Sequence, residues 1–355
     1  MAEKKKYRVA ITGTGKFAYT HLQAIEEFNQ QQSTITGRGK KAVLELIAAC
    51  DTDKERLEKF AVQAGIPLGG RYGDASLMMG RGDIDIGIVV TPPEYTAENT
   101  MLFLDAGAHV LLEKPIALSA SAAKGLVTAL HESKYQELVT MVDFIYRADA
   151  GFLKMYELIQ NGAIGRPVHA KFFKMNEINK DSPFERSFID NYLAHLVGPN
   201  FMSGGHYVFW LWMLCGLDGL SAIEGNGRKY DASYPFSNSD YNRLVFLDNF
   251  AAEIGITWLP VADEQTKEIY NVAVVMGEEG TLQYDSGKEK VYLYRQGKPK
   301  KEYCTPKRDR HRKMLELFVE KIQGKPIENF PTGLVGSEVL TVISKMNKAI
   351  QRNTV

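Results

Sequence analysis

The run HVLLEKPIAL at residues 109–118 ends an apolar segment on a carboxylate, an ammonium and a proline. Charges are common where a strand meets solvent, so Glu113 and Lys114 could be ordinary surface residues. At the carboxyl edge of a parallel sheet, however, the Lys114 ammonium could stabilise the alkoxide that forms while a carbinol is oxidised. Pro115 restricts the backbone and so holds the lysine in position. Lys114 is therefore the first candidate for a catalytic residue.

A glycine-rich turn near the amino terminus lies between an apolar run and a helical pattern. It reads G-x-G-x-x-A and consists of Gly13, Thr14, Gly15, Lys16, Phe17 and Ala18. In this pattern the first glycine permits a tight turn, the second lets the backbone approach a pyrophosphate, and the alanine allows close helix packing. The amino end of the helix favours the negative charge. The turn predicts a dinucleotide site, with a purely structural glycine turn as the alternative.

Such a site also needs an acidic residue that ends the second strand and binds the ribose hydroxyls. Asp51 is in that place, farther along the chain than usual because the polar residues 29–41 precede the strand. A carboxylate there would repel a 2′-phosphate and predicts NAD, but the neighbouring Lys54 and Arg56 leave NADP open. Asp51 could instead cap a helix over 54–65.

Two further strand ends are expected on the same side. Thr91 and Pro92 follow an apolar run at 84–93, as Glu113 and Lys114 follow the run at 109–113. Ligands of open parallel sheets bind beyond the carboxyl ends of the strands. These four residues are therefore expected to line the cofactor site.

The elements that must position these residues alternate along the first part of the chain. Apolar strand patterns alternate with helical patterns of 10 to 15 residues, which predicts right-handed βαβ units and a parallel sheet with both faces covered. We expect an α/β Rossmann domain over residues 1–146. Its strands are predicted at 7–13, 42–51, 84–93, 109–113 and 137–146, and its helices at 17–28, 54–65, 95–107 and 119–133.

The pattern changes beyond this point. We expect an α+β domain over residues 147–355 with a mostly antiparallel, open-faced sheet, in which the last four strands form a meander. The terminal helix packs either within this domain or back toward the first. The strands are predicted at 168–175, 242–259, 268–277, 281–285 and 290–295, and the helices at 149–167, 308–323 and 334–352.

Composition narrows the classes of function. Lysine plus arginine and aspartate plus glutamate both number 43, so no net charge favours nucleic acid or an anionic membrane. The basic run at 297–313 is interpreted as a solvated hairpin and helix start. No apolar run has the length of a membrane span, and we expect a cytoplasmic protein. The three cysteines predict neither a disulfide framework nor a metal site.

Together these motifs resemble the Gfo/Idh/MocA family, the group of glucose–fructose oxidoreductase and inositol dehydrogenase. The resemblance rests on GTGKFA, Asp51, TPP, DAGAHVLLEKP, IYR at Arg147, LIQNGAIGRPV, GEEGTLQYD and the terminal GSEVLTVISKMNKAI. It implies a nicotinamide-dependent dehydrogenase that acts on sugars, inositols or sugar nucleotides. It also implies a homodimer or homotetramer formed through the second sheet.

The resemblance further implies a helix with the pattern D-x-x-x-H, whose histidine exchanges the proton beside the lysine. His206 matches that histidine in the segment 200–216, which Ser203 and Gly216 are expected to cap and to stop. The family aspartate is replaced by Met202, and a later aspartate by Phe209. His206 could thus be a buried core residue.

The neighbouring run at 184–200 offers polar side chains that could compensate. They are Asp190, Tyr192, His195 and Asn200. Arg147 could contact the substrate or form a salt bridge between domains. Polar loops at 176–187 and 225–242 are candidate substrate walls.

Three functions are compatible with these residues. The first is NAD-dependent hydride transfer with Lys114 and His206 as catalytic residues. The second is a cofactor-binding regulator or scaffold that has lost catalysis, which the changes at Met202 and Phe209 favour. The third is redox-neutral glycoside processing with bound NAD.

Overall fold

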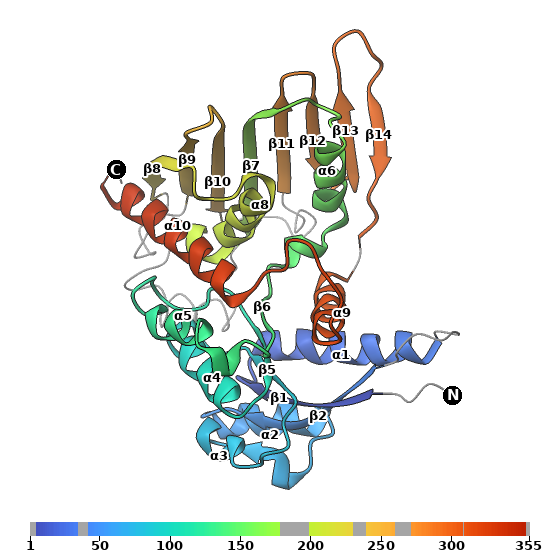
Figure 1. Ribbon diagram of the computed structural model, residues 1–355, viewed down its shortest axis with the longest axis vertical. Helices are drawn as coiled ribbons and strands as arrows, with labels where there is room; N and C mark the ends of the chain where they lie inside the picture. Colours follow the sequence, from blue (N-terminus) through green and yellow to red (C-terminus); the bar gives the residue numbers. More distant parts are fainter. Residues whose placement is uncertain are drawn as a thin grey trace. The chain divides into compact units, whose positions relative to one another are not determined.

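The computed structural model describes residues 5–34, 42–177, 199–229, 239–259, 271–307 and 309–352. The chain divides into two compact units (Figure 1). Unit 1 contains residues 1–145 and 309–340, and unit 2 contains residues 146–308 and 341–355. Among the described helices, none is both long enough and apolar enough to cross a membrane.

Unit 1 is built around a parallel sheet of six strands in the order β3-β2-β1-β4-β5-β6. This is the strand order of dinucleotide-binding folds, and it confirms the predicted Rossmann class. The strands β4 and β5 are buried along nearly all of their length because helices lie on both faces of the sheet. The strands are β1 (Lys5–Thr12), β2 (Ala42–Cys50), β3 (Arg71–Tyr72), β4 (Ile86–Val89), β5 (His109–Leu112) and β6 (Thr140–Val142).

The helices of unit 1 differ from the predicted ones at three places, one of which is the short helix α3, absent from the prediction. The polar residues 29–41 were expected to form an insert, but α1 continues to Thr34, and the Asn29 side chain exchanges two hydrogen bonds with the backbone of Leu44. The helix predicted at 119–133 is shorter, because the Ser119 hydroxyl accepts from the Ala122 N–H and so competes with helical bonding. The helices are α1 (Lys16–Thr34), α2 (Lys54–Gln63), α3 (Ala75–Met79), α4 (Pro93–Asp105), α5 (Lys124–Leu130) and α9 (Arg310–Ile322).

Unit 2 contains a sheet of eight strands in the order β14-β13-β12-β11-β7-β10-β9-β8. All neighbouring strands are antiparallel except β7 and β10, which confirms a mostly antiparallel sheet. The predicted four-strand meander is wrong, because β7 lies between β10 and β11. The strands are β7 (Pro167–Glu177), β8 (Leu220–Arg228), β9 (Ser239–Phe246), β10 (Ala251–Leu259), β11 (Asn271–Gly277), β12 (Thr281–Asp285), β13 (Lys290–Tyr294) and β14 (Lys301–Cys304).

The single strand predicted at 242–259 is also wrong, because the chain reverses within it. β9 and β10 form a hairpin whose turn contains Asn249 at a φ of +62°. The Asp248 carboxylate accepts from the Phe250 N–H and fixes the turn. Asp and Asn tolerate this backbone better than most residues, so the turn signal was present in the sequence.

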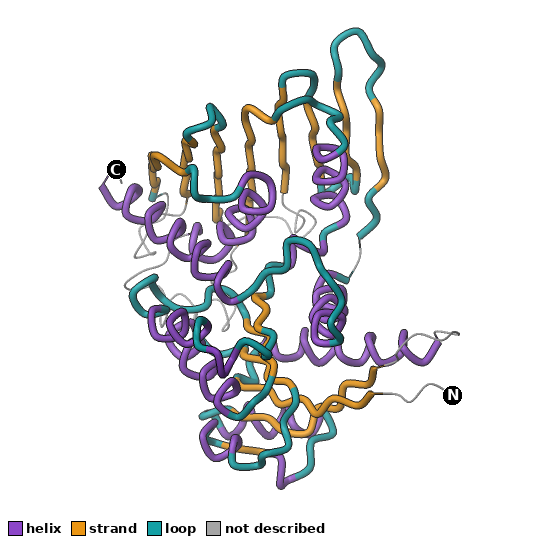
Figure 2. Tube along the Cα trace, in the orientation of Figure 1, coloured by secondary structure: helices purple, strands orange, loops and turns teal. Residues whose placement is uncertain are grey.

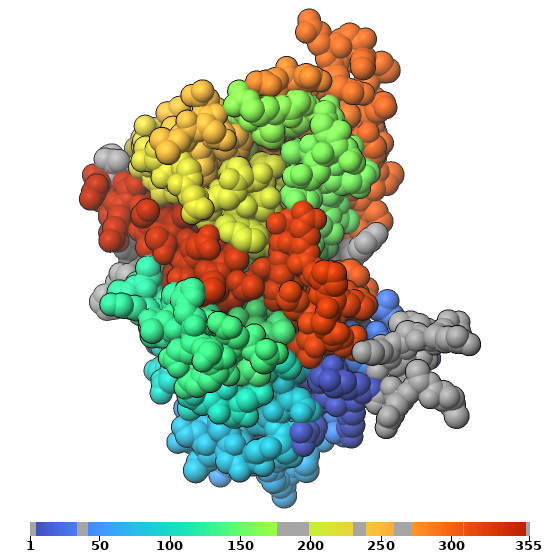
Figure 3. Space-filling view, viewed as in Figure 1, coloured from blue at the N-terminus to red at the C-terminus, as the bar shows by residue number. Residues whose placement is uncertain are grey.

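One face of this second sheet is covered by helices (Figures 1 and 3). Helix α6 (Ala150–Gln160) and helix α8 (Gly205–Cys215) meet where the Phe152 and Trp210 rings lie 5.6 Å apart. Phe172 of β7 packs against both Tyr207 and Trp210 at 5.2 and 5.4 Å. Figure 2 shows the strands in orange and these helices in purple. This aromatic core fixes the orientation of α8.

Helix α10 (Gly333–Arg352) begins in unit 1 and ends in unit 2. In unit 1, a Cβ on Gly333 would lie 2.7 Å from Leu130, and one on Gly336 would lie 2.7 Å from Val142. In unit 2, the backbone of Ile350 lies 2.9 Å from the Cβ position of Gly225. Small residues therefore allow the helix to approach both units closely.

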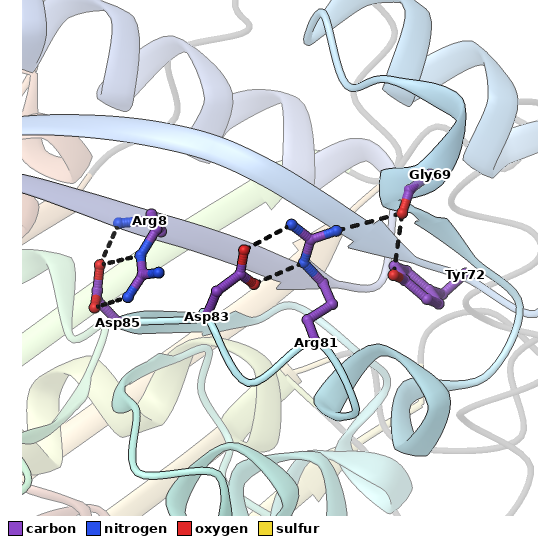
Figure 4. A network of polar contacts seen from close by, with 6 residues as sticks. All are labelled: Arg8, Gly69, Tyr72, Arg81, Asp83 and Asp85. Carbon is purple, nitrogen blue, oxygen red and sulfur yellow. Dashed lines mark hydrogen bonds and ion pairs between the residues drawn. The ribbon is translucent and has the colours of Figure 1, made fainter.

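Two ion pairs lie just before β4, at the end of the strand away from Thr91 (Figure 4). Arg8 donates to both carboxylate oxygens of Asp85 at 2.9 and 3.0 Å, and Arg81 pairs with Asp83 at 2.9 Å. Tyr72 and Arg81 both donate to the Gly69 carbonyl. These contacts hold the start of β4 against β1 and the adjoining loops.

The Asp85 pair predicts a pH dependence of stability. The Arg8 hydrogen bond lowers the pKa of Asp85, and this outweighs the effect of burial, which raises it. A lowered folded-state pKa stabilises the protein above the unfolded pKa of about 4, and this contribution disappears as the pH falls through the folded value. Asp85→Asn should therefore lower the free energy of unfolding at neutral pH, by less than about 1 kcal/mol because the pair is partly exposed. Urea unfolding of both proteins at neutral and acidic pH would measure it, and an equal difference at both would contradict it.

Candidate cofactor-binding and active site

The turn after β1 is shaped by one glycine. Gly13 has a φ of +83°, and a Cβ there would lie 2.5 Å from the Val90 carbonyl oxygen at the end of β4. Its N–H donates to the Cys50 carbonyl at 2.8 Å, so the turn joins the ends of three neighbouring strands. A Cβ on Gly15 would meet nothing within 4 Å, which leaves the turn open on that side.

Helix α1 begins directly after this turn. Its first residues, Lys16 and Phe17, are exposed, whereas Ala18 is fully buried and its N–H donates to the Gly15 carbonyl at 3.0 Å. The free N–H groups of the first helical turn and the helix dipole favour an anion at this end. The open turn and the helix start thus fit the pyrophosphate of a dinucleotide.

Asp51 lies at the end of β2 and contacts the same turn. Its Oδ2 accepts from the N–H and the hydroxyl of Thr14 at 2.8 and 2.9 Å, and its Oδ1 accepts from Arg56 at 2.9 Å. Burial raises the pKa of Asp51, but the hydrogen bonds from Arg56 and Thr14 outweigh it and lower the pKa. Asp51 is therefore an ionised carboxylate of fixed orientation. The alternative that Asp51 caps α2 is wrong, because the Asp53 side chain accepts from the Arg56 N–H there.

The ends of β4 and β5 lie beside this turn in the sheet. Thr91 and Pro92 follow β4, and Pro92 directly precedes α4. Glu113 and Lys114 follow β5, where the Glu113 N–H donates to the Val89 carbonyl at 2.9 Å. Both side chains are half-buried, and the Lys114–Pro115 peptide bond is cis. Unit 1 therefore brings the predicted cofactor residues to one edge of the sheet.

In unit 2, the candidate histidine lies at the start of α8. His206 is 4% exposed, and its ring faces that of Tyr146 with centroids 4.7 Å apart. The predicted Ser203 cap is wrong, because a π-helical turn over Asn200–Gly204 precedes α8 and continues into it. The predicted stop at Gly216 is confirmed by its φ of +69° at the end of the helix.

Polar groups that the sequence did not indicate surround this histidine. The Tyr207 hydroxyl donates to the side-chain Oδ1 of Asn271 at 2.7 Å, and Nδ2 of Asn271 in turn donates to the Tyr146 hydroxyl at 2.9 Å. The Lys174 ammonium lies 3.5 Å from the Ser203 hydroxyl. Asn271 begins the otherwise apolar strand β11, which was an available signal, whereas Lys174 lies in β7 among several other polar residues and had none.

The other predicted substrate residues have different positions. Arg147 is half-buried in a short 3-10 turn over Ile145–Ala148. Asn200 is buried, and its N–H donates to the Asp240 carboxylate at 3.1 Å, a carboxylate that sequence reasoning missed. Tyr192, His195 and Asp190 lie outside the described residues.

The structure also describes Met202 and Phe209, the two positions where the sequence lacks the aspartates of the family pattern. Met202 is half-buried in the π-helical turn, and Phe209 is buried with its ring stacked on Trp212 at 5.8 Å. Phe209 therefore contributes to the packing of α8 and brings no carboxylate to His206.

Comparison with known sequences connects this geometry to characterised proteins. Residues 7–141 match the family model described as an oxidoreductase family with an NAD-binding Rossmann fold (GFO_IDH_MocA). Inositol 2-dehydrogenase of Salmonella typhimurium is 25% identical over 177 residues, which cover 48% of this chain and 47% of that protein. The 1,5-anhydro-D-fructose reductase of Ensifer adhaerens is 32% identical over 129 residues, 36% of this chain and 37% of that protein. The matched stretches thus span about half or less of these relatives.

Solved structures share the fold over nearly the whole chain. Levoglucosan dehydrogenase in complex with NADH has a TM-score of 0.81 at 15% identity and covers 99% of this chain and 98% of its own. UDP-N-acetylglucosamine 3-dehydrogenase of Acidithiobacillus ferrooxidans has a TM-score of 0.75 at 17% identity, with 98% of each chain covered. At these identities the likeness establishes the fold of both units.

Proposed function

We propose that the chain is a nicotinamide-dependent dehydrogenase or reductase, because residues 7–141 match the model of the Gfo/Idh/MocA oxidoreductase family with an NAD-binding Rossmann fold. The proposed substrate is a secondary alcohol of a sugar, an inositol or a sugar nucleotide. The observation that carries the proposal is Lys114 at the carboxyl end of β5, on the same sheet edge as the open turn at Gly15 and the Asp51 carboxylate.

The residues of unit 1 have distinct proposed roles. The turn from Gly13 to Ala18 and the start of α1 bind the pyrophosphate, and Asp51 accepts hydrogen bonds from a ribose. When bound, NAD accepts or supplies the hydride. Lys114 stabilises the oxygen of the reacting alcohol as negative charge develops on it.

In unit 2, the residue proposed to exchange the proton of the alcohol is His206. Its contact with Tyr146 and the hydrogen bonds among Tyr146, Asn271 and Tyr207 support this role, because they fix the ring and its surroundings. Asp240 is a buried carboxylate near Asn200 in the same unit and is proposed to replace the aspartate lost at Met202.

The relatives support the substrate class. Their names contain an inositol, an anhydro-fructose, levoglucosan and a sugar nucleotide, all polyhydroxylated compounds. A pocket for such a substrate needs hydrogen-bonding side chains, and the half-buried Lys174 of unit 2 is proposed as one of them.

The test is an activity screen. The protein is incubated with NAD⁺ or NADP⁺ and a panel of inositols, sugars and sugar nucleotides, and the absorbance of the reduced cofactor is followed. Reduction with one class of compound supports the proposal. Cofactor binding without turnover on any compound would instead indicate the second candidate, a regulator without catalysis. The changes at Met202 and Phe209 are the sequence features that favour this candidate.

Cofactor choice gives a specific prediction. Asp51 is an ionised carboxylate, which would repel a 2′-phosphate, while Arg56 already lies beside it as a cation. Asp51→Ser should therefore raise kcat/KM for NADP relative to NAD by about tenfold or more, since each factor of ten requires only about 1.4 kcal/mol. The matched variant Arg56→Gln should move the ratio in the opposite direction. An unchanged ratio in both variants would remove Asp51 from cofactor recognition.

The second sheet is the proposed surface for self-association. Phe173 of β7 and Tyr241 of β9 are 44% and 45% exposed and lie on either side of Gly255 of β10, away from the helices. Such an exposed aromatic patch on a sheet face is typical of an interface. Sedimentation velocity at several concentrations would test for a homodimer or homotetramer.

A further inference from the structure

Four titratable side chains of unit 1 meet at a point that the proposed hydride transfer does not use. His21 lies on α1, Glu113 directly follows β5, Asp143 directly follows β6, and His311 lies in the first turn of α9. One nitrogen or carboxylate oxygen of each residue lies within 4.8 Å of those of the other three. Segments far apart in the sequence thus bring two imidazoles and two carboxylates together.

The atoms that face one another are already close. His21 Nε2 lies 3.0 Å from Glu113 Oε1 and 4.0 Å from Asp143 Oδ2. His311 Nδ1 lies 2.8 Å from the same Asp143 oxygen. The Asp143 oxygen is therefore shared between the two histidines, and their rings are edge-to-face with centroids 5.7 Å apart.

Burial makes this arrangement of charge costly without a cation. The side chains of His21 and Asp143 are 3% and 1% exposed, and that of Glu113 is 13% exposed. Among the described residues, Asp143 Oδ1 is buried without a hydrogen-bond partner. A buried and a half-buried carboxylate, the buried one with an oxygen left over, require positive charge close by.

We propose that His21, Glu113, Asp143 and His311 bind one divalent transition-metal ion, and that zinc is the ion that fits best. Two imidazole nitrogens and two carboxylate oxygens are ligands that zinc accepts in tetrahedral sites. Calcium and magnesium prefer oxygen ligands alone, so the two histidines select against them. The binding atoms are Nε2 of His21, Oε1 of Glu113, Oδ2 of Asp143 and Nδ1 of His311.

The distances are compatible with this ion. Zinc–ligand bonds of about 2.0–2.1 Å in a tetrahedron separate the ligand atoms by about 3.3 Å. The hydrogen-bonded pairs at 2.8 and 3.0 Å must widen slightly, and the other separations, up to 4.8 Å, must shorten. Binding displaces the protons that the pairs share.

A site with four protein ligands leaves no open position for water or substrate, so the proposed role is structural. The ion would tie α9 to α1 and to the ends of β5 and β6. It would also fix Glu113, whose Oε2 lies 3.3 Å from the N–H of Lys114. The site does not depend on the proposed dehydrogenase activity.

The test uses the full chain stripped of metal with a chelator, and zinc alone as the probe. Cys215→Ser and Cys304→Ser are introduced in all samples, because both thiols are exposed and a thiolate is a ligand that zinc accepts. Zinc content after dialysis and calorimetric titration give stoichiometry and affinity. His311→Gln removes one ligand at a side chain that is 20% exposed, and His131→Gln is the control outside the cluster.

We expect one zinc ion per chain, unchanged affinity in His131→Gln and a loss on the order of 100-fold in His311→Gln. The melting temperature of the parent protein should keep rising as the zinc concentration is raised to about 100 times Kd and above. The melting temperature of His311→Gln should not rise over the same range. If His311→Gln does not fold, zinc affinity and melting temperature are measured on Asp143→Asn instead. Binding of no zinc, or equal binding in the parent and both cluster variants, would overturn the proposal and leave a metal-free hydrogen-bonded cluster.

Discussion

Lys114→Ala should lower kcat by about 100- to 1000-fold, because it removes the cation that faces the oxygen on which negative charge develops. The dissociation constant for NAD should hardly change, since the turn at Gly13 and the Asp51 carboxylate are untouched. Stopped-flow turnover with a substrate from the screen and fluorescence titration of the reduced cofactor would measure the two effects separately.

The controls for this prediction lie in the same domain. Lys124→Ala removes an exposed lysine of α5 and should leave turnover unchanged. Lys114→Arg retains the charge on a planar, bulkier group and should recover only part of the rate. If Lys114→Ala turned over as fast as the parent, the lysine would be a surface residue at a strand end, and the assignment of the site would fail.

Gly13→Ala should be the most destabilising single change in the nucleotide turn. The backbone at φ +83° disfavours any side chain, and the new Cβ would lie 2.5 Å from the Val90 carbonyl oxygen and 2.8 Å from its carbon. Backbone strain of this kind costs roughly 1–3 kcal/mol, and the clash with backbone adds to it because Val90 is held by β4. We expect a loss of about 3 kcal/mol or more in urea unfolding.

Substitutions at two other glycines separate the backbone strain from the clash with Val90. Gly107 has a φ of +79° but open space around its Cβ position, so Gly107→Ala should show the strain alone. Gly15 has open space and no positive φ, so Gly15→Ala should leave stability nearly unchanged while it weakens NAD binding. Equal losses of stability in Gly13→Ala and Gly107→Ala would show that the contact with Val90 does not matter.

Much of unit 1 could be predicted from the sequence because its signals are local. The strands β4 and β5 are continuous apolar runs, α2 begins at a polar cap, and the order of the elements determines a parallel sheet. The end of α1 was missed because the bonds between Asn29 and Leu44 join residues that no local pattern connects. Unit 2 was less predictable because β7 pairs with strands about 80 to 110 residues further along the chain.

The residues of the candidate site also divide into those that the sequence predicts and those that it does not. The glycines, Asp51 and Lys114 carry their chemistry in short motifs, and the sheet brings them to one edge. By contrast, Asn271, Lys174 and Asp240 contact residues 29 to 125 positions away and belong to no motif. The cluster around His21 is of the same kind, since the nearest two of its members in sequence come from different strand ends. Contacts of this type follow from packing and cannot be read from spacing.

The position of α9 has a consequence for how the protein is made. Unit 2 interrupts unit 1, which is completed by residues 309–340. In unit 1 the Val142 N–H at the edge strand donates to the Pro331 carbonyl at 2.8 Å, and α9 packs against α1. A ribosome that has released only the first 145 residues has therefore produced a sheet whose edge and whose α1 are still bare. We therefore expect unit 1 to complete its fold only after residues 309–340 have been translated.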